Sequence, residues 1–235
     1  MVRGERVLIV NADDFGHSHG VNAGVVEAHE TGIVTSASLM VLQAGAGEAA
    51  AYARAEARLG VGLHLDLGEW IHFEGSWQPV YQRVPPEDAA AVEREVSEQL
   101  GRFRDLVGRD PTHLDSHQHV HLDGAAGAVA GRLAAKLAVP LRARTAGVSY
   151  RGDFYGQTGT GEPLPDAIAP ERLLELIGSL PEGVTELACH PGRGVDSDTY
   201  GREREREVEA LCDPRVRAAI ERGGIRLSSF AEVRA

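Results

Sequence analysis

The chain has 235 residues, of which 43% are hydrophobic and 25% charged, an ordinary composition for a globular protein and a length consistent with one domain over residues 1–235. Its formal net charge of −11 argues against nucleic acid or an anionic membrane as the main partner, because both would be repelled at long range. No stretch approaches the ~18 consecutive apolar residues of a membrane span, so a small neutral or cationic substrate fits best.

Strand-like and helix-like segments alternate along the chain, after an N-terminus that lacks the apolar region of a signal peptide and so predicts a cytoplasmic protein. The pattern predicts strands over 6–10, 34–41, 61–67, 112–115, 141–143, 185–189 and 225–227. It predicts helices over 21–30, 48–59, 87–107, 125–138 and 170–179, with two short ones between 203 and 222. Segments 68–86 and 145–169 lack clear periodicity and are predicted as long loops.

Regular alternation of strands and helices predicts an α/β fold with a mainly parallel sheet, although periodicity does not separate a closed barrel from an open sheet. The polar residues favour the barrel. Asp13 and Asp14 follow the first predicted strand, and His64, His117 and His190 stand at the ends of three others. We therefore expect a TIM-barrel-like (β/α) barrel, irregular and with about seven strands, whose two long loops form the substrate walls.

Histidines are concentrated in one short segment, because four of the 10 in the chain fall between positions 113 and 121. A divalent metal needs neutral imidazoles and a carboxylate on rigid supports, with a position left open for water and substrate. Asp14, His64 and His117 meet that need at three predicted strand ends. The other members of the cluster have no predicted role: His113, His119 and His121.

The adjacent carboxylates of Asp13 and Asp14 are expected to do different work, because neighbouring side chains at a strand end point in different directions. One can bind metal while the other takes a proton from water, so Asp13 is the candidate general base and Asp14 the candidate ligand. The residues leave the reverse assignment open. We expect Asp115 to hydrogen-bond a ligand imidazole and His190 to protonate a leaving amine.

The chain resembles the YdjC-like carbohydrate deacetylases, which include the chito-oligosaccharide deacetylase. The resemblance lies in motifs that occur in the same order: Asn11-Ala-Asp-Asp-Phe-Gly16, Gly32-Ile-Val-Thr-Ser36, Gly62-Leu-His64, Thr112-His-Leu-Asp-Ser-His-Gln-His-Val-His121 and His190-Pro-Gly192. Any one motif would be weak, but together they make the resemblance specific over positions 6–192.

The resemblance implies a TIM-barrel-like fold and the hydrolysis of an N-acetyl group from an amino sugar or short oligosaccharide. It also implies a bound divalent metal, usually assigned as Mg²⁺, with Zn²⁺ or another divalent ion as the alternative. The metal-binding residues of the family correspond to Asp14, His64 and His117, and its catalytic aspartate to the Asp13-Asp14 pair.

Two other classes of function stay open from the residues. A metal-dependent barrel enzyme could act on a sugar phosphate, although no basic or glycine-rich phosphate cradle is visible in the sequence. A non-catalytic sugar-binding or metal-binding protein could keep the histidines, but it would not need Asp13 beside Asp14. The expected partner is thus a small N-acetylated carbohydrate, and a homodimer is compatible with a barrel of this size although no sequence feature establishes it.

Four aromatic residues fall in the first predicted loop: Trp70, Phe73, Trp77 and Tyr81. Their rings suit stacking on the apolar face of a sugar. They suit packing within the loop or a subunit contact equally well, and the sequence does not choose among these interpretations.

Overall fold

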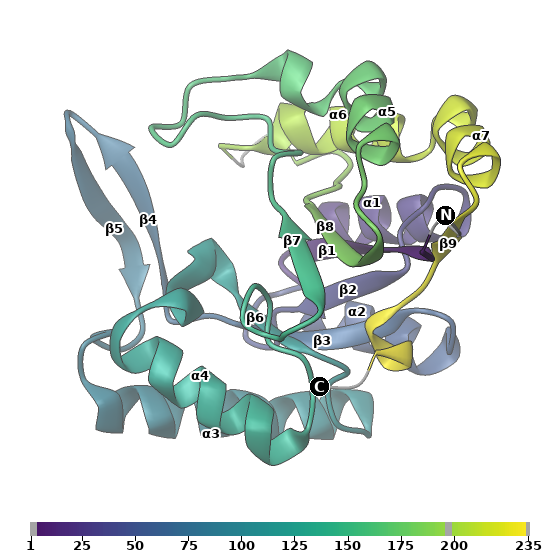
Figure 1. Cartoon of the computed structure of the whole chain (residues 1–235). Coiled ribbons are helices and arrows are strands. Elements are labelled where there is room, and N and C mark those ends of the chain that lie inside the picture. Colours follow the sequence, from purple (N-terminus) through teal and green to yellow (C-terminus); the bar gives the residue numbers. More distant parts are fainter. Residues whose placement is uncertain (1–3, 196–198, 234–235) are drawn as a thin grey trace.

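Strands and helices alternate in the computed structural model, which describes residues 4–195 and 199–233 (Figure 1). The strands are β1 (Arg6–Phe15), β2 (Ser36–Leu39), β3 (Gly60–Leu65), β4 (Gly68–Phe73), β5 (Ser76–Gln82), β6 (Leu114–Ser116), β7 (Val148–Arg151), β8 (Gly183–Cys189) and β9 (Ile225–Leu227). The helices are α1 (His19–Glu30), α2 (Ala46–Ala55), α3 (Ala89–Val107), α4 (Gly124–Leu137), α5 (Pro170–Gly178), α6 (Gly201–Leu211) and α7 (Pro214–Arg222). Residues 1–3, which begin the predicted domain and its N-terminal sequence, lie outside the described residues.

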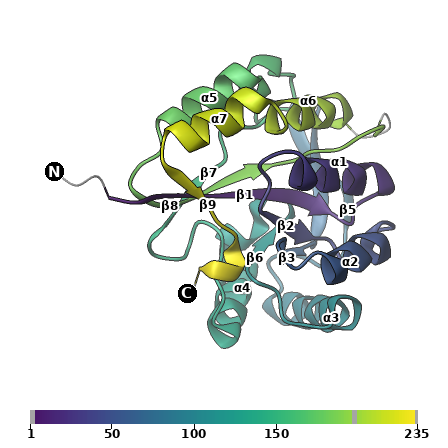
Figure 2. The same cartoon turned by 90° about the vertical axis from the view of Figure 1, so that its right-hand side faces the viewer.

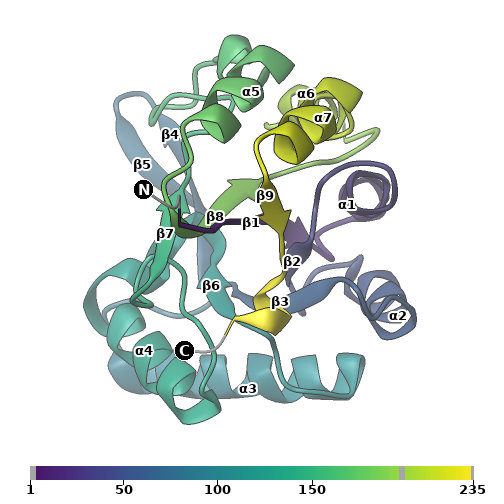
Figure 3. The same cartoon turned by 45° about the vertical axis from the view of Figure 1, so that its right-hand side comes forward.

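Seven strands form a parallel sheet in the order β6-β3-β2-β1-β8-β7, with β9 also paired to β1. Strand β1 is central, because Arg6–Leu8 pairs with β8 on one edge and β9 on the other, and β2 takes over the second edge from Asn11 onward. The strands curl into a half-barrel with the helices arranged around it (Figure 3). The predicted TIM-barrel-like α/β fold is confirmed.

Helix α3 shows how the sequence specifies the helical layer. Its apolar residues, spaced three or four positions apart, are buried: Val92, Val96, Leu100, Phe103 and Val107. The Asp88 side chain caps the first turn by accepting from the backbone N–H groups of Ala90 and Ala91, and Gly108, at φ 79°, ends the helix. Figure 2 shows α5, α6 and α7 grouped on the opposite side from α3 and α4. Among the helices described, none has the length and apolar character to cross a membrane.

The strand predicted over 141–143 is wrong. Only Leu141 pairs, in a single parallel bridge with Leu114 of β6. Ala143 adopts φ 55°, and the N–H groups of Arg144 and Thr145 donate to the carbonyl of Leu141, so the chain turns at once. The segment still matters, because it carries the Arg142 side chain into the barrel.

Both predicted long loops contain strands. Segment 68–86 forms a hairpin of β4 and β5 that turns at Glu74 and Gly75, both with positive φ, and projects beyond the sheet (Figure 1). Segment 145–169 contains β7, which pairs with β8. Strand β1 is also longer than predicted and runs through Asp13 and Asp14 to Phe15. A strand that does not pack on the core need not alternate apolar and polar residues, and β5 is almost entirely exposed. The sequence pattern therefore does not predict this hairpin.

Candidate active site

The predicted site residues meet at one end of the sheet. Asp13 and Asp14 lie near the C-terminal end of β1 and His64 near that of β3, while His117 and His190 directly follow β6 and β8. Because parallel strands present their C-terminal ends at the same edge, these side chains converge as predicted. All of them line a cavity of about 680 Å³.

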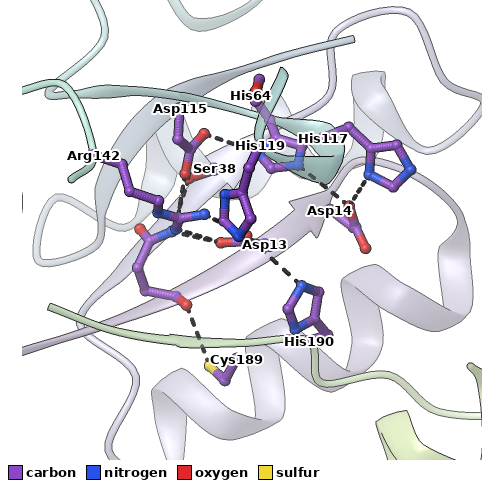
Figure 4. A network of polar contacts seen from close by, with 12 residues as sticks. Asp13, Asp14, Ser38, His64, Asp115, His117, His119, Arg142, Cys189 and His190 are labelled. Atoms are coloured by element: carbon purple, nitrogen blue, oxygen red, sulfur yellow. Dashed lines mark hydrogen bonds and ion pairs between the residues drawn. The ribbon is translucent and has the colours of Figure 1, made fainter. Parts of the chain in front are cut away.

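A local irregularity in β1 separates the two adjacent aspartates. The register of β1 against β2 shifts between Ala12 and Phe15, and Asp14 has φ 61°, in the left-handed region that Asp tolerates better than most residues. Asp13 points to Arg142 inside the barrel, whereas Asp14 points to His64 and His117 (Figure 4). The two carboxylates are therefore available for different tasks.

Asp14, His64 and His117 form a group whose ligand atoms all lie within 4.8 Å of one another. Asp14 Oδ1 is 3.4 Å from His64 Nε2 and 3.1 Å from His117 Nδ1. The second oxygen, Oδ2, accepts from Arg204 at 2.8 Å, which leaves Oδ1 facing the two imidazoles. One carboxylate and two imidazoles on rigid strand ends are a donor set that fits a divalent cation.

The pKa values of Asp14 and His64 are both shifted by their surroundings. Burial opposes ionisation of Asp14, but Arg204 and the hydrogen bonds from His117 and His64 hold the pKa of its carboxyl well below the usual range. Burial also opposes protonation of His64, yet Asp115 and Asp14 raise its pKa to about 10. A metal ion must therefore displace a proton from His64 before that imidazole can act as a ligand.

Asp115 contacts the imidazole that it was expected to orient. Its Oδ1 lies 2.8 Å from His64 Nδ1, and its Oδ2 accepts from Ser38 at 2.6 Å. The contact to Nδ1 leaves Nε2 of His64 directed at Asp14. This carboxylate–imidazole pair has the form that fixes the tautomer and ring orientation of a metal-binding histidine.

A second set of three possible metal ligands consists of Asp13, His64 and Asp115, whose ligand atoms also lie within 4.8 Å of one another. The Arg142 guanidinium already neutralises it, since its Nη atoms lie 2.6 Å from each oxygen of Asp13 and Nη2 lies 2.9 Å from Asp115 Oδ2. Nε of Arg142 also donates to Glu186 at 2.7 Å. A metal cation is better accommodated beside Asp14, because Arg204 contacts only Oδ2 of this carboxylate and Oδ1 faces the two imidazoles.

Asp13 and His190 form the proton-handling side of the cavity. Asp13 Oδ2 is 3.7 Å from His190 Nε2, and its Oδ1 accepts from Asn11 at 2.9 Å. Burial opposes ionisation of Asp13, but Arg142 lowers the pKa of its carboxyl. Burial lowers the pKa of His190 to about 4. Both groups are consequently unprotonated at neutral pH.

His190 is held by aromatic rings and by its own backbone. Tyr155 and Tyr200 lie edge-on to its imidazole, at ring distances of 5.2 Å and 5.7 Å. Its backbone N–H donates to the buried carboxylate of Glu207, which also accepts from the Tyr200 hydroxyl at 2.6 Å. The ring is thereby held beside Asp13, where it lines the cavity.

The other clustered histidines do not continue a strand, because Gln118 and His119 have φ near 50° and 56° directly after β6. His113 is buried, stacked on Phe230 and hydrogen-bonded to Ser38. His121 is buried against Ser116. His119 lines the cavity, with Nε2 3.2 Å from the hydroxyl of Tyr150.

Sequence reasoning missed the two arginines that neutralise the aspartate pair. Arg142 stands in the short apolar run Pro140-Leu141-Arg142-Ala143, and a charge inside such a run was the available signal. Arg204 lies within alternating arginines and glutamates over 202–207, a pattern typical of a solvated helix face. It gave no sign that Arg204 would be buried.

Comparisons with known proteins identify the family of the chain. The family model described as YdjC-like protein matches residues 7–222. A chitooligosaccharide deacetylase from Salmonella schwarzengrund (strain CVM19633) is 34% identical over 259 residues, covering 97% of this chain and 100% of the relative. A carbohydrate deacetylase from Geobacillus stearothermophilus is 33% identical over 250 residues, covering 97% and 98%.

Solved structures share the fold. A protein of Enterococcus faecalis V583, described as a candidate cellobiose-phosphate cleavage protein, superposes with a TM-score of 0.78 and 29% identity over 98% of this chain and 100% of that one. A family 4 carbohydrate esterase from Streptomyces lividans, in complex with acetate, superposes with a TM-score of 0.58 and 13% identity over 99% and 97%. The second likeness concerns the fold alone. With a family match over most of its length and relatives above 30% identity, the chain belongs to the YdjC-like protein family.

Proposed function

We propose that this protein is a divalent-metal-dependent hydrolase that removes N-acetyl groups from amino sugars or short oligosaccharides. The observation that carries the proposal is the juxtaposition, in one cavity, of the Asp14, His64 and His117 group with Asp13 and His190. The names of the relatives, chitooligosaccharide deacetylase and carbohydrate deacetylase, support the choice of substrate.

A divalent cation held by Asp14, His64 and His117 would supply Lewis-acid activation of a water molecule and of the acetamide carbonyl. The resemblance to the family implies Mg²⁺. Two imidazoles among three ligands suit Zn²⁺ or Co²⁺ better, because Mg²⁺ prefers an all-oxygen shell. The ion that restores activity to the metal-stripped protein therefore identifies the working metal.

The residues around the cation handle the protons. Asp13 accepts the proton of the attacking water at Oδ2, since this oxygen accepts from Arg142 and keeps a second lone pair, whereas Oδ1 accepts from both Arg142 and Asn11. His190 donates a proton to the leaving nitrogen. Because Asp13 and His190 are both unprotonated before reaction and lie 3.7 Å apart, the proton taken from water is the one passed to the amine.

The test is acetate release from diacetylchitobiose by metal-stripped protein, before and after addition of Mg²⁺, Zn²⁺, Mn²⁺ or Co²⁺. We expect no release without metal and restored release with at least one ion, together with one bound ion per chain by elemental analysis. A protein that binds the ion without releasing acetate from any N-acetylated sugar would contradict the deacetylase and favour a binding protein.

A second candidate is a metal-dependent reaction on a phosphorylated disaccharide, favoured by the description of the Enterococcus faecalis relative. Arg204 is the one arginine in the described lining of the cavity, and it already contacts Asp14 and the carbonyl oxygen of His190. The lining thus offers a phosphate group little beyond histidines. Turnover of a phosphorylated, unacetylated disaccharide without acetate release from N-acetylated sugars would establish this candidate instead.

Three further expectations from the sequence stay predictions. They are a single domain over residues 1–235, a cytoplasmic location and pairing into a homodimer. Light scattering of the purified protein measures the last directly.

A further inference from the structure

The cavity extends outward from the Asp14 group between two walls that the mechanism does not use. One wall is the hairpin of β4 and β5, which contributes Trp70, His72 and Trp77. The other is the loop that contains Thr158 and Thr160 with the intervening and following glycines. Because the hairpin projects beyond the sheet, these walls lie outside the catalytic edge (Figure 1).

An aromatic pair forms the first wall. His72 and Trp77 are direct cross-strand partners, with ring centroids 5.7 Å apart, and both line the cavity. Trp77 nevertheless keeps 57% of its surface exposed. Phe73, next along β4 and 53% exposed, is not part of the cavity lining. As the neighbour of His72 in the strand, it lies on the opposite face of the hairpin.

The hairpin is fastened at its base. The side chain of Gln118 accepts from the backbone N–H of Trp70 at 2.9 Å and donates to its carbonyl at 2.7 Å. Farther down, the Tyr81 hydroxyl and Arg83 both donate to buried Asp66 at 2.9 Å. Gln118 directly follows His117, so the aromatic wall is held in a fixed relation to the candidate metal ligand.

The opposing wall is polar. Thr158 and Thr160 hydroxyls lie 3.1 Å apart, and both contact the carboxylate of Glu162. These hydrogen bonds lower the pKa of Glu162. Both walls line the same cavity, so the threonine hydroxyls and the aromatic pair bound one space. A Cβ added at Gly159, which lines the cavity, would meet nothing within 4 Å, so no other part of the protein fills the space beside this residue.

An aromatic face opposite hydroxyls matches a pyranose ring, which has an apolar C–H face and a rim of hydroxyls. We propose that the space between Trp77 and Thr158–Gly161 is an outer subsite that binds the second sugar ring of a linear amino-sugar oligosaccharide. The ring that carries the reacting acetamide then sits beside Asp14. This inference rests on the proposed deacetylase function and adds that the enzyme selects disaccharides or longer chains over monosaccharides.

The test compares kcat/KM for acetate release from diacetylchitobiose and from N-acetylglucosamine, using the metal-loaded enzyme. Trp77→Ala should lower the value for the disaccharide by about tenfold, the order expected for loss of one aromatic contact, and leave the value for the monosaccharide within about twofold of wild type. Trp77→Phe keeps an aromatic face and should retain most of the preference. Phe73→Ala, a change of the same kind on the other face of the hairpin, is the matched control and should alter neither value.

Three other results would contradict the subsite at Trp77. Equal losses on both sugars, or a loss in Phe73→Ala as large as in Trp77→Ala, would overturn the subsite and identify the hairpin as a structural or subunit contact, which light scattering of both variants would reveal. If the wild type is active and Trp77→Ala has the same kcat/KM as wild type on both sugars, the subsite is overturned but the proposed deacetylase function is not. A wild type that releases acetate from neither sugar would overturn the proposed function and the subsite with it.

A second readout does not depend on turnover. The dissociation constant for diacetylchitobiose, measured by calorimetry in a metal-loaded Asp13→Asn background, should rise about tenfold when Trp77→Ala is added. An unchanged constant would contradict the stacking contact even if the rates had changed.

Discussion

At the scale of single residues, the site depends on one backbone torsion. Asp14 in the left-handed region turns its side chain away from that of Asp13, so one acidic pair serves two partners. Asp13 meets Arg142, and Asp14 meets Arg204 together with two imidazoles. Each carboxylate thus remains ionised although it is buried.

The division of labour between the aspartates gives a paired prediction. Asp13→Asn removes the proton acceptor and should lower kcat by about 10²–10⁴-fold, the range for one general base, while the bound metal is retained. His117→Ala removes a proposed ligand and should lose the metal as well as the activity. Metal content by elemental analysis beside acetate release separates the two effects, and full activity in Asp13→Asn would reject its assignment as base.

The aspartates and histidines could be predicted because they are chemically distinctive and stand where predicted strands end. Their arginine partners could not. The position of Arg142 depends on the turn at Ala143, and that of Arg204 depends on which face of α6 is buried. Residue types alone do not predict either feature. A local pattern reports which groups are present at a strand end, but the groups that neutralise them come from distant segments.

At the scale of elements, the hairpin of β4 and β5 differs from the rest of the structure. Strands β1, β2, β3 and β6 of the seven-stranded sheet are almost entirely buried, whereas nearly all of β5 is exposed. Apart from β7 and the C-terminal half of β1, the strands of this sheet and the helices were predicted to within a few residues, because burial imposes a period on the sequence. The hairpin was predicted as a loop because its order comes from cross-strand pairing and from the hydrogen bonds to Gln118 and Asp66.

The anchoring role of Gln118 is testable without an activity assay. Gln118→Ala removes two hydrogen bonds to Trp70, each contributing about 0.5–1.5 kcal/mol, so the amide of Trp70 should exchange with solvent faster. Amides of β1 should be unaffected. Hydrogen exchange followed by mass spectrometry resolves the two segments, and unchanged protection across β4 would show that the hairpin is held by other contacts.

At the scale of the whole molecule, stability depends on carboxyls buried within the fold. Burial raises the pKa of Glu207 to about 8, although hydrogen bonds from His190 and Tyr200 and the charge of Arg204 oppose the shift. In the unfolded chain the group titrates near its ordinary value of 4.5. Between these values the folded protein holds a proton that the unfolded chain has released, so this group makes the fold less stable as pH rises.

Glu207→Gln should therefore flatten the pH dependence of stability. Relative to this variant, wild type should lose roughly 1 kcal/mol of unfolding free energy per pH unit between pH 5 and 8. Urea unfolding at a series of pH values measures the difference. Glu209→Gln, which removes an exposed carboxyl from the same helix, controls for the loss of one negative charge, and parallel curves for wild type and Glu207→Gln would contradict the prediction.

The central position of β1 has a consequence for biosynthesis. The strand that carries Asp13 and Asp14 leaves the ribosome more than 160 residues before its neighbours β8 and β9. The arginines that neutralise the pair are 129 and 190 residues away in sequence. Contacts between residues so distant in sequence slow folding. Until these contacts form, the nascent chain exposes an apolar strand and two carboxylates without their arginine partners, and such a strand is prone to aggregate. The two aspartates are thus made long before the arginines that neutralise them.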